Sequence, residues 1–390
     1  MMSSQAKLCI LSTNLSTNCT NRCLRLAQAL QPYYRVELIG PTFGVGTHAG
    51  EGVWPPLAGV DIPVRSVRGD RLPQFLPEVG KLLRLCDGDL LLACKPRFPS
   101  YGVALLKRSL SGKPVILDID DDELAMTLPG KKAAWYRKLL HTEAYLHTRW
   151  THRLHGRADA KLVISENFRQ RYGGVLVPHP MDGREIDPGR YDRTQIRAEL
   201  GITPQHVVLG FMGTPNPHKG IDLILSALER INRPELIALV VGASPSDLYV
   251  NQLASQYGER LRLLPMQPIA RIPYFLAAMD LVTLPQRDSA ETWGQMPAKL
   301  TDAMAMAKPI LAASTADIPR YLDGRGLLFE PGDLAGFVEQ VEWFLLHRVE
   351  ADVMGQRARQ YFTSHLDMPV VGDLLQGIIE PLLPRSLRRD

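Results

Sequence analysis

The sequence predicts an α/β protein with two doubly wound parallel sheets, one in each of two lobes. Three observations carry this prediction. The chain has 390 residues, too many for one ordinary hydrophobic core and suited to two lobes of roughly 150–200 residues each. Short, nearly continuous apolar runs alternate with longer segments of helical periodicity, as in parallel sheets covered on both faces. A stretch rich in Pro, Gly and Asp, residues 179–189, separates two such series.

The expected strands are the apolar runs. In the first series they are residues 7–11, 36–39, 90–93, 115–119, 161–164 and 175–177. In the second series they are residues 207–212, 237–241, 261–264, 281–284, 309–312 and 327–329. We therefore expect an N-terminal lobe over residues 1–180 and a C-terminal lobe over residues 190–360. Residues 361–390 are expected to be a helical segment that can cross back to the N-terminal lobe.

Composition excludes several classes of protein. Hydrophobic residues make up 45% and charged residues 22% of the chain, which is typical of a folded globular protein. The net charge of +4 is too small to argue for a nucleic-acid partner. The five cysteines suit reduced thiols better than a disulfide framework or a zinc site. No apolar stretch approaches the ~18–20 residues of a membrane span, so we expect a cytoplasmic protein.

A basic, aromatic-rich segment covers residues 131–157. It holds seven Lys or Arg residues, four His residues and one acid, Glu143, together with Trp and Tyr residues. One interpretation is a solvated helical face whose apolar side is buried. The other is a surface for an anionic acceptor or for peripheral contact with an acidic membrane, at its cytoplasmic face.

Two strand ends in the second half carry groups suited to a phosphorylated ligand. The first run, residues 207–212, leads through Gly213 and Thr214 to Lys219 at the start of a helical pattern. Free backbone N–H groups at a helix start already favour an anion, and a lysine adds a compact positive charge. The alternative is a solvated lysine.

The second strand end is followed by Gly294, Gln295 and Met296 and then by a helical pattern. Gly294 permits close backbone approach, and the amides of Gln295 and Met296 are expected at the helix start. Lys299 and Asp302 are three residues apart and so share one helical face. A cation for phosphate beside a carboxylate for sugar hydroxyls suits a nucleotide-sugar; the alternative is a surface ion pair.

Together these segments resemble the donor-binding lobe of GT-B glycosyltransferases, most closely the large family-four retaining group. The resemblance rests on Lys219-Gly-Ile-Asp222, on Gly294-Gln-Met-Pro297 and on Asp302-Ala-Met-Ala305 followed by Lys308-Pro309. It covers residues 205–335. It implies two Rossmann-like lobes facing a central cleft, a nucleotide-sugar such as a UDP- or GDP-sugar as co-substrate, and no metal or other cofactor.

The sequence departs from this family in two places. The arginine that usually precedes the lysine by five or six residues is replaced by Thr214 or Gly213, so Lys299 is the candidate for the second charge. The first glutamate of the Glu-x7-Glu pair becomes Gly294, while Asp302 retains a carboxylate for the ribose. Glu291, three residues earlier, is the candidate replacement for the glutamate that contacts the sugar.

Two N-terminal features are candidates for the acceptor side. Asp120 stands where the family often places a histidine, within an acidic run over residues 118–123. An active-site role and a helix N-cap are both open for these acids. Ser12 and Asn14 lie in a loop after the first strand, where they either line the cleft or form a capping turn.

These features predict a retaining glycosyltransferase acting in glycan biosynthesis. A sugar would move from a nucleotide-diphosphate sugar to an acceptor hydroxyl, with Asp120 and Glu291 as candidate catalytic residues. A glycan, a lipid-linked molecule and a small molecule all fit as acceptor. The alternatives are a sugar-nucleotide epimerase or phosphorylase on the same fold, and a non-catalytic nucleotide-sugar binder.

Overall fold

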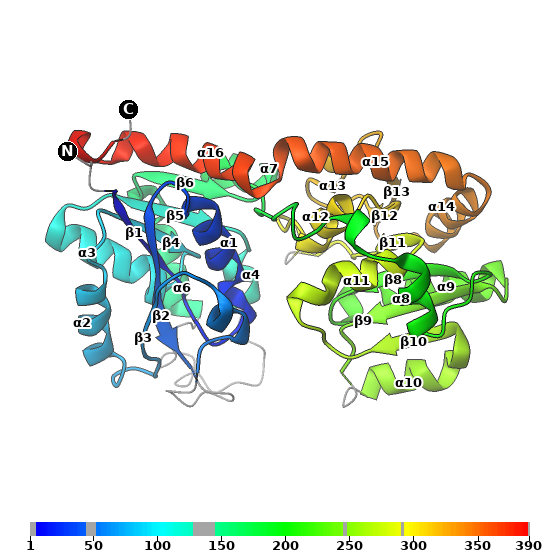
Figure 1. The fold of residues 1–390 in the computed structure, drawn as a ribbon. Helices are drawn as coiled ribbons and strands as arrows, with labels where there is room; N and C mark the ends of the chain where they lie inside the picture. The colour runs from blue at the N-terminus through cyan, green and yellow to red at the C-terminus, as the bar shows by residue number, and fades with distance from the viewer. Residues whose placement is uncertain (1–4, 44–51, 128–144, 245–247, 290–291, 389–390) are drawn as a thin grey trace. The chain divides into compact units, whose positions relative to one another are not determined.

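The chain forms two compact units, each built around one parallel sheet (Figure 1). The computed structural model describes residues 5–43, 52–127, 145–244, 248–289 and 292–388. Unit 1 comprises Met1–Pro180 and Met368–Asp390, and unit 2 comprises Met181–Asp367. Within the described ranges, no helix is long and apolar enough to cross a membrane.

Unit 1 has a seven-stranded sheet in the order β3-β2-β1-β4-β5-β6-β7, with every neighbouring pair parallel. Its strands are β1 (Lys7–Leu11), β2 (Arg35–Thr42), β3 (Val64–Arg68), β4 (Leu90–Cys94), β5 (Val115–Ile119), β6 (Ala160–Val163) and β7 (Val175–Leu176). Its helices are α1 (Asn21–Leu30), α2 (Leu76–Leu85), α3 (Val103–Ser111), α4 (Glu123–Met126), α6 (Tyr145–Arg153), α7 (Glu166–Tyr172) and α16 (Met368–Ile379).

Unit 2 has a six-stranded parallel sheet in the order β10-β9-β8-β11-β12-β13. Its strands are β8 (Val207–Met212), β9 (Leu236–Val241), β10 (Leu261–Leu264), β11 (Leu281–Leu284), β12 (Ile310–Ala313) and β13 (Leu327–Phe329). Its helices are α8 (Arg193–Glu199), α9 (Ile221–Ile231), α10 (Leu248–Tyr257), α11 (Ile272–Ala278), α12 (Ala298–Ala305), α13 (Ile318–Leu322), α14 (Leu334–Leu346) and α15 (Arg348–His365).

Both sheets have the strand order of doubly wound nucleotide-binding folds. The chain starts each sheet near its middle, at β1 or β8, builds outward to one edge and then returns to build the other half. The predicted α/β class with two doubly wound sheets is therefore confirmed. The first strand of each sheet is buried along nearly its whole length, as its continuous apolar sequence predicts.

One strand was not predicted from the sequence. β3 (Val64–Arg68) has the sequence Val-Arg-Ser-Val-Arg and pairs only with β2, at the edge of its sheet. Of its side chains only that of Val67 is buried. An edge strand needs less apolar sequence because one long side of it borders solvent, so it lacks the continuous run by which the other strands were recognised.

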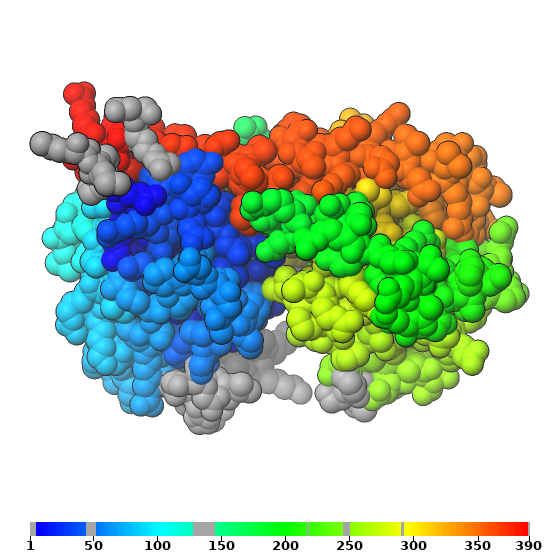
Figure 2. Space-filling model, viewed as in Figure 1, coloured from blue at the N-terminus to red at the C-terminus, as the bar shows by residue number. Residues whose placement is uncertain are grey.

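The C-terminal helix α16 belongs to unit 1. It packs against α1, and its buried Val371, Leu375 and Ile379 join the core beneath the sheet. Tyr33 donates a hydrogen bond to Asp373 at 2.5 Å, and Tyr34 donates one to Glu380 at 2.8 Å. The red C-terminal segment lies over the blue N-terminal segment in Figure 2. Residues more than 330 positions apart in sequence thus complete one hydrophobic core.

Candidate functional site

Two loops meet at the centre of the unit 2 sheet. β8 and β11 are adjacent and parallel, so the loops that leave their carboxyl ends emerge at the same edge of the sheet. The chain order reverses between these two strands, and ligands of open α/β sheets bind at such a switch point. The loop after β8 carries Gly213, Thr214 and Lys219, and the loop after β11 leads through Gly294 to α12.

Lys219 lies between the two loops. It ends the short turn directly before α9, and its Nζ is 3.3 Å from Oε1 of Gln286 and 3.5 Å from Oε1 of Gln295. Gln286 is buried and follows β11 by two residues. The two side-chain oxygens that contact the ammonium are amide carbonyls, which carry no net charge. Gln286 was not predicted from the sequence, although a polar residue two positions after a buried strand was a usable signal.

A glycine allows the two loops to pack backbone to backbone. Gly220, at the start of α9, has φ +72°, and a Cβ there would lie 1.9 Å from the carbonyl oxygen of Pro285. Any side chain would therefore push the β8 loop away from the β11 loop. The Lys-Gly pair of the first motif thus places Lys219 beside the second motif.

Lys299 approaches Lys219 from α12. Its Nζ lies 4.4 Å from the ring centre of Phe211 on β8, and a Cβ on Gly213 would lie 2.8 Å from that Nζ. Within the described part of the chain it forms neither a hydrogen bond nor an ion pair. Burial and the nearby Lys219 lower the pKa of Lys299 to about 7, although Asp302 opposes the shift. This second cation is therefore only partly charged at neutral pH until an anion arrives.

Asp302 is buried, with 7% of its surface exposed. It lies one helical turn after Lys299 on α12. Its burial excludes the alternative of a surface ion pair for these two residues. The structure thus brings Lys219, Lys299 and Asp302 to one edge of one sheet, as their spacing predicted.

The segment before α12 differs in detail from expectation. The helix begins at Ala298, with Pro297 at its N-cap, and Gly294 and Met296 are buried. The backbone amide of Gln295 donates to the carbonyl of Thr292 at 3.1 Å, so it is used within a turn rather than offered to a ligand. The side chain of Gln295 contacts Lys219 instead. Thr214 is exposed, and Glu291 lies outside the described residues.

The acidic run after β5 forms a buried charged cluster in unit 1. Asp118 is fully buried and is paired with Arg22, whose Nη2 is 2.8 Å from Oδ1 of Asp118. Asp122 accepts a hydrogen bond from the backbone of Ala125 and is the N-cap of α4. Asp120 is 9% exposed, and its Oδ1 lies 3.1 Å from Nζ of Lys95. The N-cap interpretation therefore applies to Asp122. Asp120 faces a buried lysine, and its active-site role stays a prediction.

Asp120 has an unusual charge state. Burial, together with Asp121 and Asp118, raises the pKa of Asp120 to about 7 despite the opposing effect of Lys95. Such a carboxyl group exchanges a proton near neutral pH, as groups at functional sites often do. Sequence reasoning missed Lys95, although it directly follows β4, which pairs with β5.

Ser12 and Asn14 form a local turn after β1. Both are buried, and the hydroxyl of Ser12 accepts from the amide of Asn14 at 3.3 Å. The side-chain oxygen of Asn14 accepts from the amide of Ser16 at 2.9 Å. These side chains therefore hydrogen-bond to the backbone of their own loop, as in an Asx turn. Neither of them caps α1.

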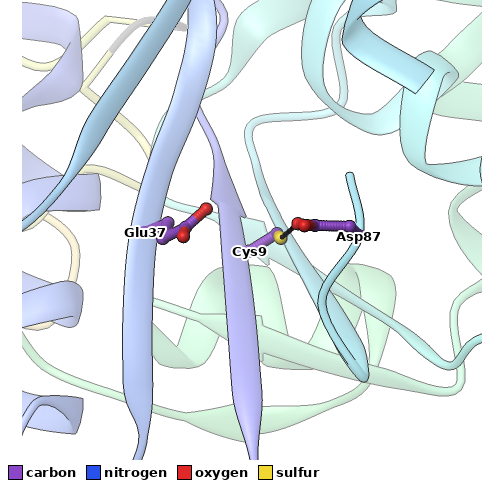
Figure 3. A group of neighbouring side chains, drawn as sticks. All are labelled: Cys9, Glu37 and Asp87. Carbon is purple, nitrogen blue, oxygen red and sulfur yellow. Dashed lines mark hydrogen bonds between the residues drawn. The ribbon is translucent and has the colours of Figure 1, made fainter. Parts of the chain in front are cut away.

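Among the described residues, two groups of side chains have the composition of metal sites, and each lies beside a lysine. Asp120, Asp121 and Glu123 enclose Lys95. Cys9 on β1, Glu37 on β2 and Asp87 before β4 lie together in Figure 3, where Cys9 contacts Asp87 at 3.9 Å. In this second group Lys7 lies 2.9 Å from Glu37 and 2.8 Å from Asp87. Burial also raises the pKa of Cys9 to about 11, which keeps the thiol protonated at neutral pH.

Comparison with known proteins agrees with this geometry. Residues 206–347, which contain both loops and α12, match the family described as glycosyl transferases group 1. Residues 206–347 are called the group 1 domain below, after the family that they match. The D-inositol 3-phosphate glycosyltransferase of Segniliparus rotundus is 30% identical to the chain over 152 residues. The lipopolysaccharide core mannosyltransferase LpsB of Rhizobium meliloti is 26% identical over 212 residues.

These sequence matches are partial. The first covers 37% of this chain and 32% of the Segniliparus protein, and the second covers 51% and 59%. The chain thus spans about a third of the length of one curated relative and somewhat more than half of the other.

Solved structures match over nearly the whole chain. Anabaena HepE in complex with UDP has a TM-score of 0.74 at 20% identity, covering 96% of this chain and 100% of that one. Sucrose-phosphate synthase of Thermosynechococcus elongatus has a TM-score of 0.72 at 14% identity, covering 97% and 99%. The predicted GT-B fold is confirmed by these matches, which extend beyond the group 1 domain into unit 1.

Proposed function

We propose that this protein is a retaining glycosyltransferase that moves a sugar from a nucleotide-diphosphate sugar to an acceptor hydroxyl. The observation that carries the proposal is the meeting of Lys219, Lys299 and Asp302 at the switch point of the group 1 domain. Two cations suit a diphosphate, and a buried carboxylate suits the ribose hydroxyls. HepE has been solved with UDP and with UDP-glucose, which supports a nucleotide-sugar as the ligand class.

The two lysines would stabilise the leaving diphosphate. Negative charge builds on it as the glycosidic bond breaks, and cations aimed at that charge lower the barrier. Lys299 takes the place of the missing arginine in this scheme. Because its pKa is about 7 in the free protein, an arriving diphosphate would favour the charged form and draw a proton onto it.

Retention requires that the acceptor attack from the face that the diphosphate leaves. The departing phosphate oxygen would then take the proton of the acceptor hydroxyl. Asp120 would orient the acceptor or the sugar, and Glu291 would contact the sugar in place of the missing first glutamate. That no metal is required stays a prediction. The positive charge beside the proposed diphosphate position comes from lysines.

A lipid-linked or anionic acceptor fits one surface of unit 1. Of the basic aromatic segment 131–157, residues 131–144 lie outside the described residues. The remainder includes α6, which exposes Leu146 and Trp150 beside the exposed Arg149 and Arg153. Apolar side chains flanked by basic ones suit contact with an anionic membrane. We therefore propose peripheral membrane contact here; a cytoplasmic location stays a prediction.

The donor site is tested by binding and turnover of UDP-, GDP- and ADP-sugars. A thermal-shift screen should select one nucleotide, because a ligand that binds the folded state raises its apparent stability. Lys219→Ala and Asp302→Ala should each weaken binding of that nucleotide by at least about tenfold, the loss of one charge-assisted contact. Calorimetry that finds unchanged affinity in both variants would show that the site is misplaced. Lys81→Ala, which removes an exposed lysine of α2 in unit 1, is the control.

The alternatives separate in the same assay. Slow hydrolysis of the donor without acceptor indicates a transferase, and interconversion of the sugar indicates an epimerase. Release of a sugar phosphate when inorganic phosphate is added indicates a phosphorylase. Binding without turnover, persisting after candidate acceptors are added, indicates a non-catalytic binder.

A further inference from the structure

A single buried lysine organises the acidic cluster after β5. Lys95 is 5% exposed, and its Nζ donates hydrogen bonds to Asp121 at 2.6 Å and to Glu123 at 2.7 Å. Its third neighbour is Asp120, at 3.1 Å. An ammonium group has three donors, and here three carboxylates surround it. Although burial opposes its charge, these carboxylates raise the pKa of Lys95, so it is an ammonium at neutral pH.

The backbone fixes Lys95 in place. Its φ of +69° lies in the left-handed region, which residues with a side chain seldom adopt. Its amide donates to the carbonyl of Asp118 at 2.8 Å, and its own carbonyl accepts from the hydroxyl of Ser100 at 2.8 Å. β4 and the carboxyl end of β5 therefore hold the ammonium directly beside the acidic run.

Asp120 differs from three other acids of the cluster. Asp118 is paired with Arg22, Asp122 with Arg171, and Glu123 with Arg97. Within the described residues Asp120 has no arginine partner and shares Lys95 with two other carboxylates. Lys95 contacts Oδ1 of the Asp120 carboxylate, whereas Oδ2 makes neither a hydrogen bond nor an ion pair within the described residues. In a side chain that is only 9% exposed, such an oxygen is an acceptor that a ligand hydroxyl or amine can use.

A second cluster of charges, at the amino ends of the strands of the same sheet, provides a contrast. Lys7, at the start of β1, also lies between two carboxylates, those of Glu37 and Asp87. There Arg65 contacts both carboxylates as well. Although burial opposes the shift, Lys7 and Arg65 lower the pKa of Asp87 to about 2. Each carboxylate of the cluster at Lys7 thus contacts a lysine and an arginine, whereas Asp120 contacts Lys95 alone within the described residues and keeps Oδ2 as an acceptor.

We propose that Lys95 is a positioning residue, whose ammonium group, anchored by Asp121 and Glu123, holds the Asp120 carboxylate ready to accept a hydrogen bond from a substrate hydroxyl. The substrate class, a sugar donor or a hydroxyl acceptor, rests on the proposed function. The link between Lys95 and Asp120 rests on the geometry of unit 1 alone.

The link is tested by following the ionisation of Asp120 directly. The full-length protein is labelled with carbon-13 at the aspartate carboxyl groups, and Asp120→Asn identifies the signal. Removing the ammonium in Lys95→Met should raise the titration midpoint of Asp120 by about one pH unit or more, because the nearest positive charge is lost. In Lys95→Arg the positive charge is kept, so the titration midpoint of Asp120 should lie close to that of the unaltered protein. Lys7→Met, the matched control in the second cluster, should leave the midpoint unchanged.

An unchanged midpoint in folded Lys95→Met protein would overturn the proposal. If that variant does not fold, Lys95→Gln replaces it, since a neutral amide still donates hydrogen bonds to Asp121 and Glu123.

Enzyme turnover distinguishes a role of Lys95 in positioning Asp120 from a role in stabilising the fold alone. With the donor selected by the screen, the acid limb of the pH–rate profile should move upward in Lys95→Met and return in Lys95→Arg. A purely structural role would lower the rate by the same factor at every pH and would contradict the proposal. If the unaltered protein turns over no sugar nucleotide, the proposed function fails, whereas the titration still decides whether Lys95 controls Asp120.

Discussion

At the scale of single residues, the proposed donor site contains two lysines whose surroundings differ. Lys219 lies between the side-chain carbonyls of Gln286 and Gln295. Lys299 lies against Phe211 and close to Lys219, so its charged form is disfavoured. The second cation therefore depends on pH and on the ligand.

Nucleotide affinity should follow the protonation of Lys299. Below about pH 7 Lys299 is charged in the free protein, and above it Lys299 must take up a proton to pair with a diphosphate. Affinity for UDP should therefore fall by up to about tenfold per pH unit above this value, until the pKa of the bound state is reached. Calorimetry between about pH 7 and pH 9, in buffers of different ionisation enthalpy, should detect uptake of up to one proton.

The matched variant is Lys299→Met, which keeps the apolar stem against Phe211. It should bind UDP more weakly near neutral pH and show little proton uptake. Proton uptake equal to that of the unaltered protein would assign the titration to another group.

At the scale of elements, two strand–loop–helix units form the site by close backbone contact. β8 leads to α9 and β11 leads to α12, and the two loops touch where Gly220 meets Pro285. The helix starts bring N–H groups and the lysines to the same sheet edge. The glycine that follows Lys219 is therefore required for the packing of the two loops, and it is also part of the sequence motif.

Gly220→Ala should separate the two loops. The new Cβ would overlap the Pro285 carbonyl at 1.9 Å, in addition to the strain of a positive φ, and this strain alone costs about 1–2 kcal/mol. We expect a larger loss of stability than that, measured by chemical unfolding, together with weaker UDP binding. Gly201→Ala is the control, because Gly201 also has a positive φ but has open space around its Cβ position. Equal losses in the two variants would contradict the close contact.

At the scale of the whole molecule, the C-terminal segment of the chain belongs to the same unit as its N-terminal half. α16 completes the core of unit 1, while α15, just before it, belongs to unit 2. The stability of unit 1 therefore depends on residues that follow unit 2 in sequence. In Figure 1 this connection is the orange-to-red helical segment.

Leu375→Ala should lower the stability of unit 1 and leave the stability of the group 1 domain nearly unchanged. Leu375 is fully buried on α16, and removing such a side chain costs about 2–5 kcal/mol. Hydrogen exchange should show reduced protection in β1, β2 and α1, with little change in β8 and α9. Leu374→Ala, at a neighbouring residue that is 39% exposed, should change little. Equal loss of protection in both units would mean that they unfold as one body.

The local sequence determined much of this protein. Continuous apolar runs located every strand except β3, because buried parallel strands have that composition. The spacing of Lys219, Gly294, Lys299 and Asp302 predicted a common edge, because loops after adjacent parallel strands emerge together. Residues three or four positions apart in a helix share a face by helical geometry alone, so the relation between Lys299 and Asp302 is visible in sequence.

The tertiary structure decided which distant groups meet. Gln286 contacts Lys219 across 67 residues, Arg22 pairs with Asp118 across 96, and Tyr33 bonds Asp373 across 340. Lys95 belongs to the cluster of Asp120 only because β4 pairs with β5. Periodicity reports burial but not the identity of a partner across the core. The sequence therefore determined the two sheets and the sheet edge at which Lys219 and Lys299 lie. Only folding made Asp120 a carboxyl group held by a buried ammonium.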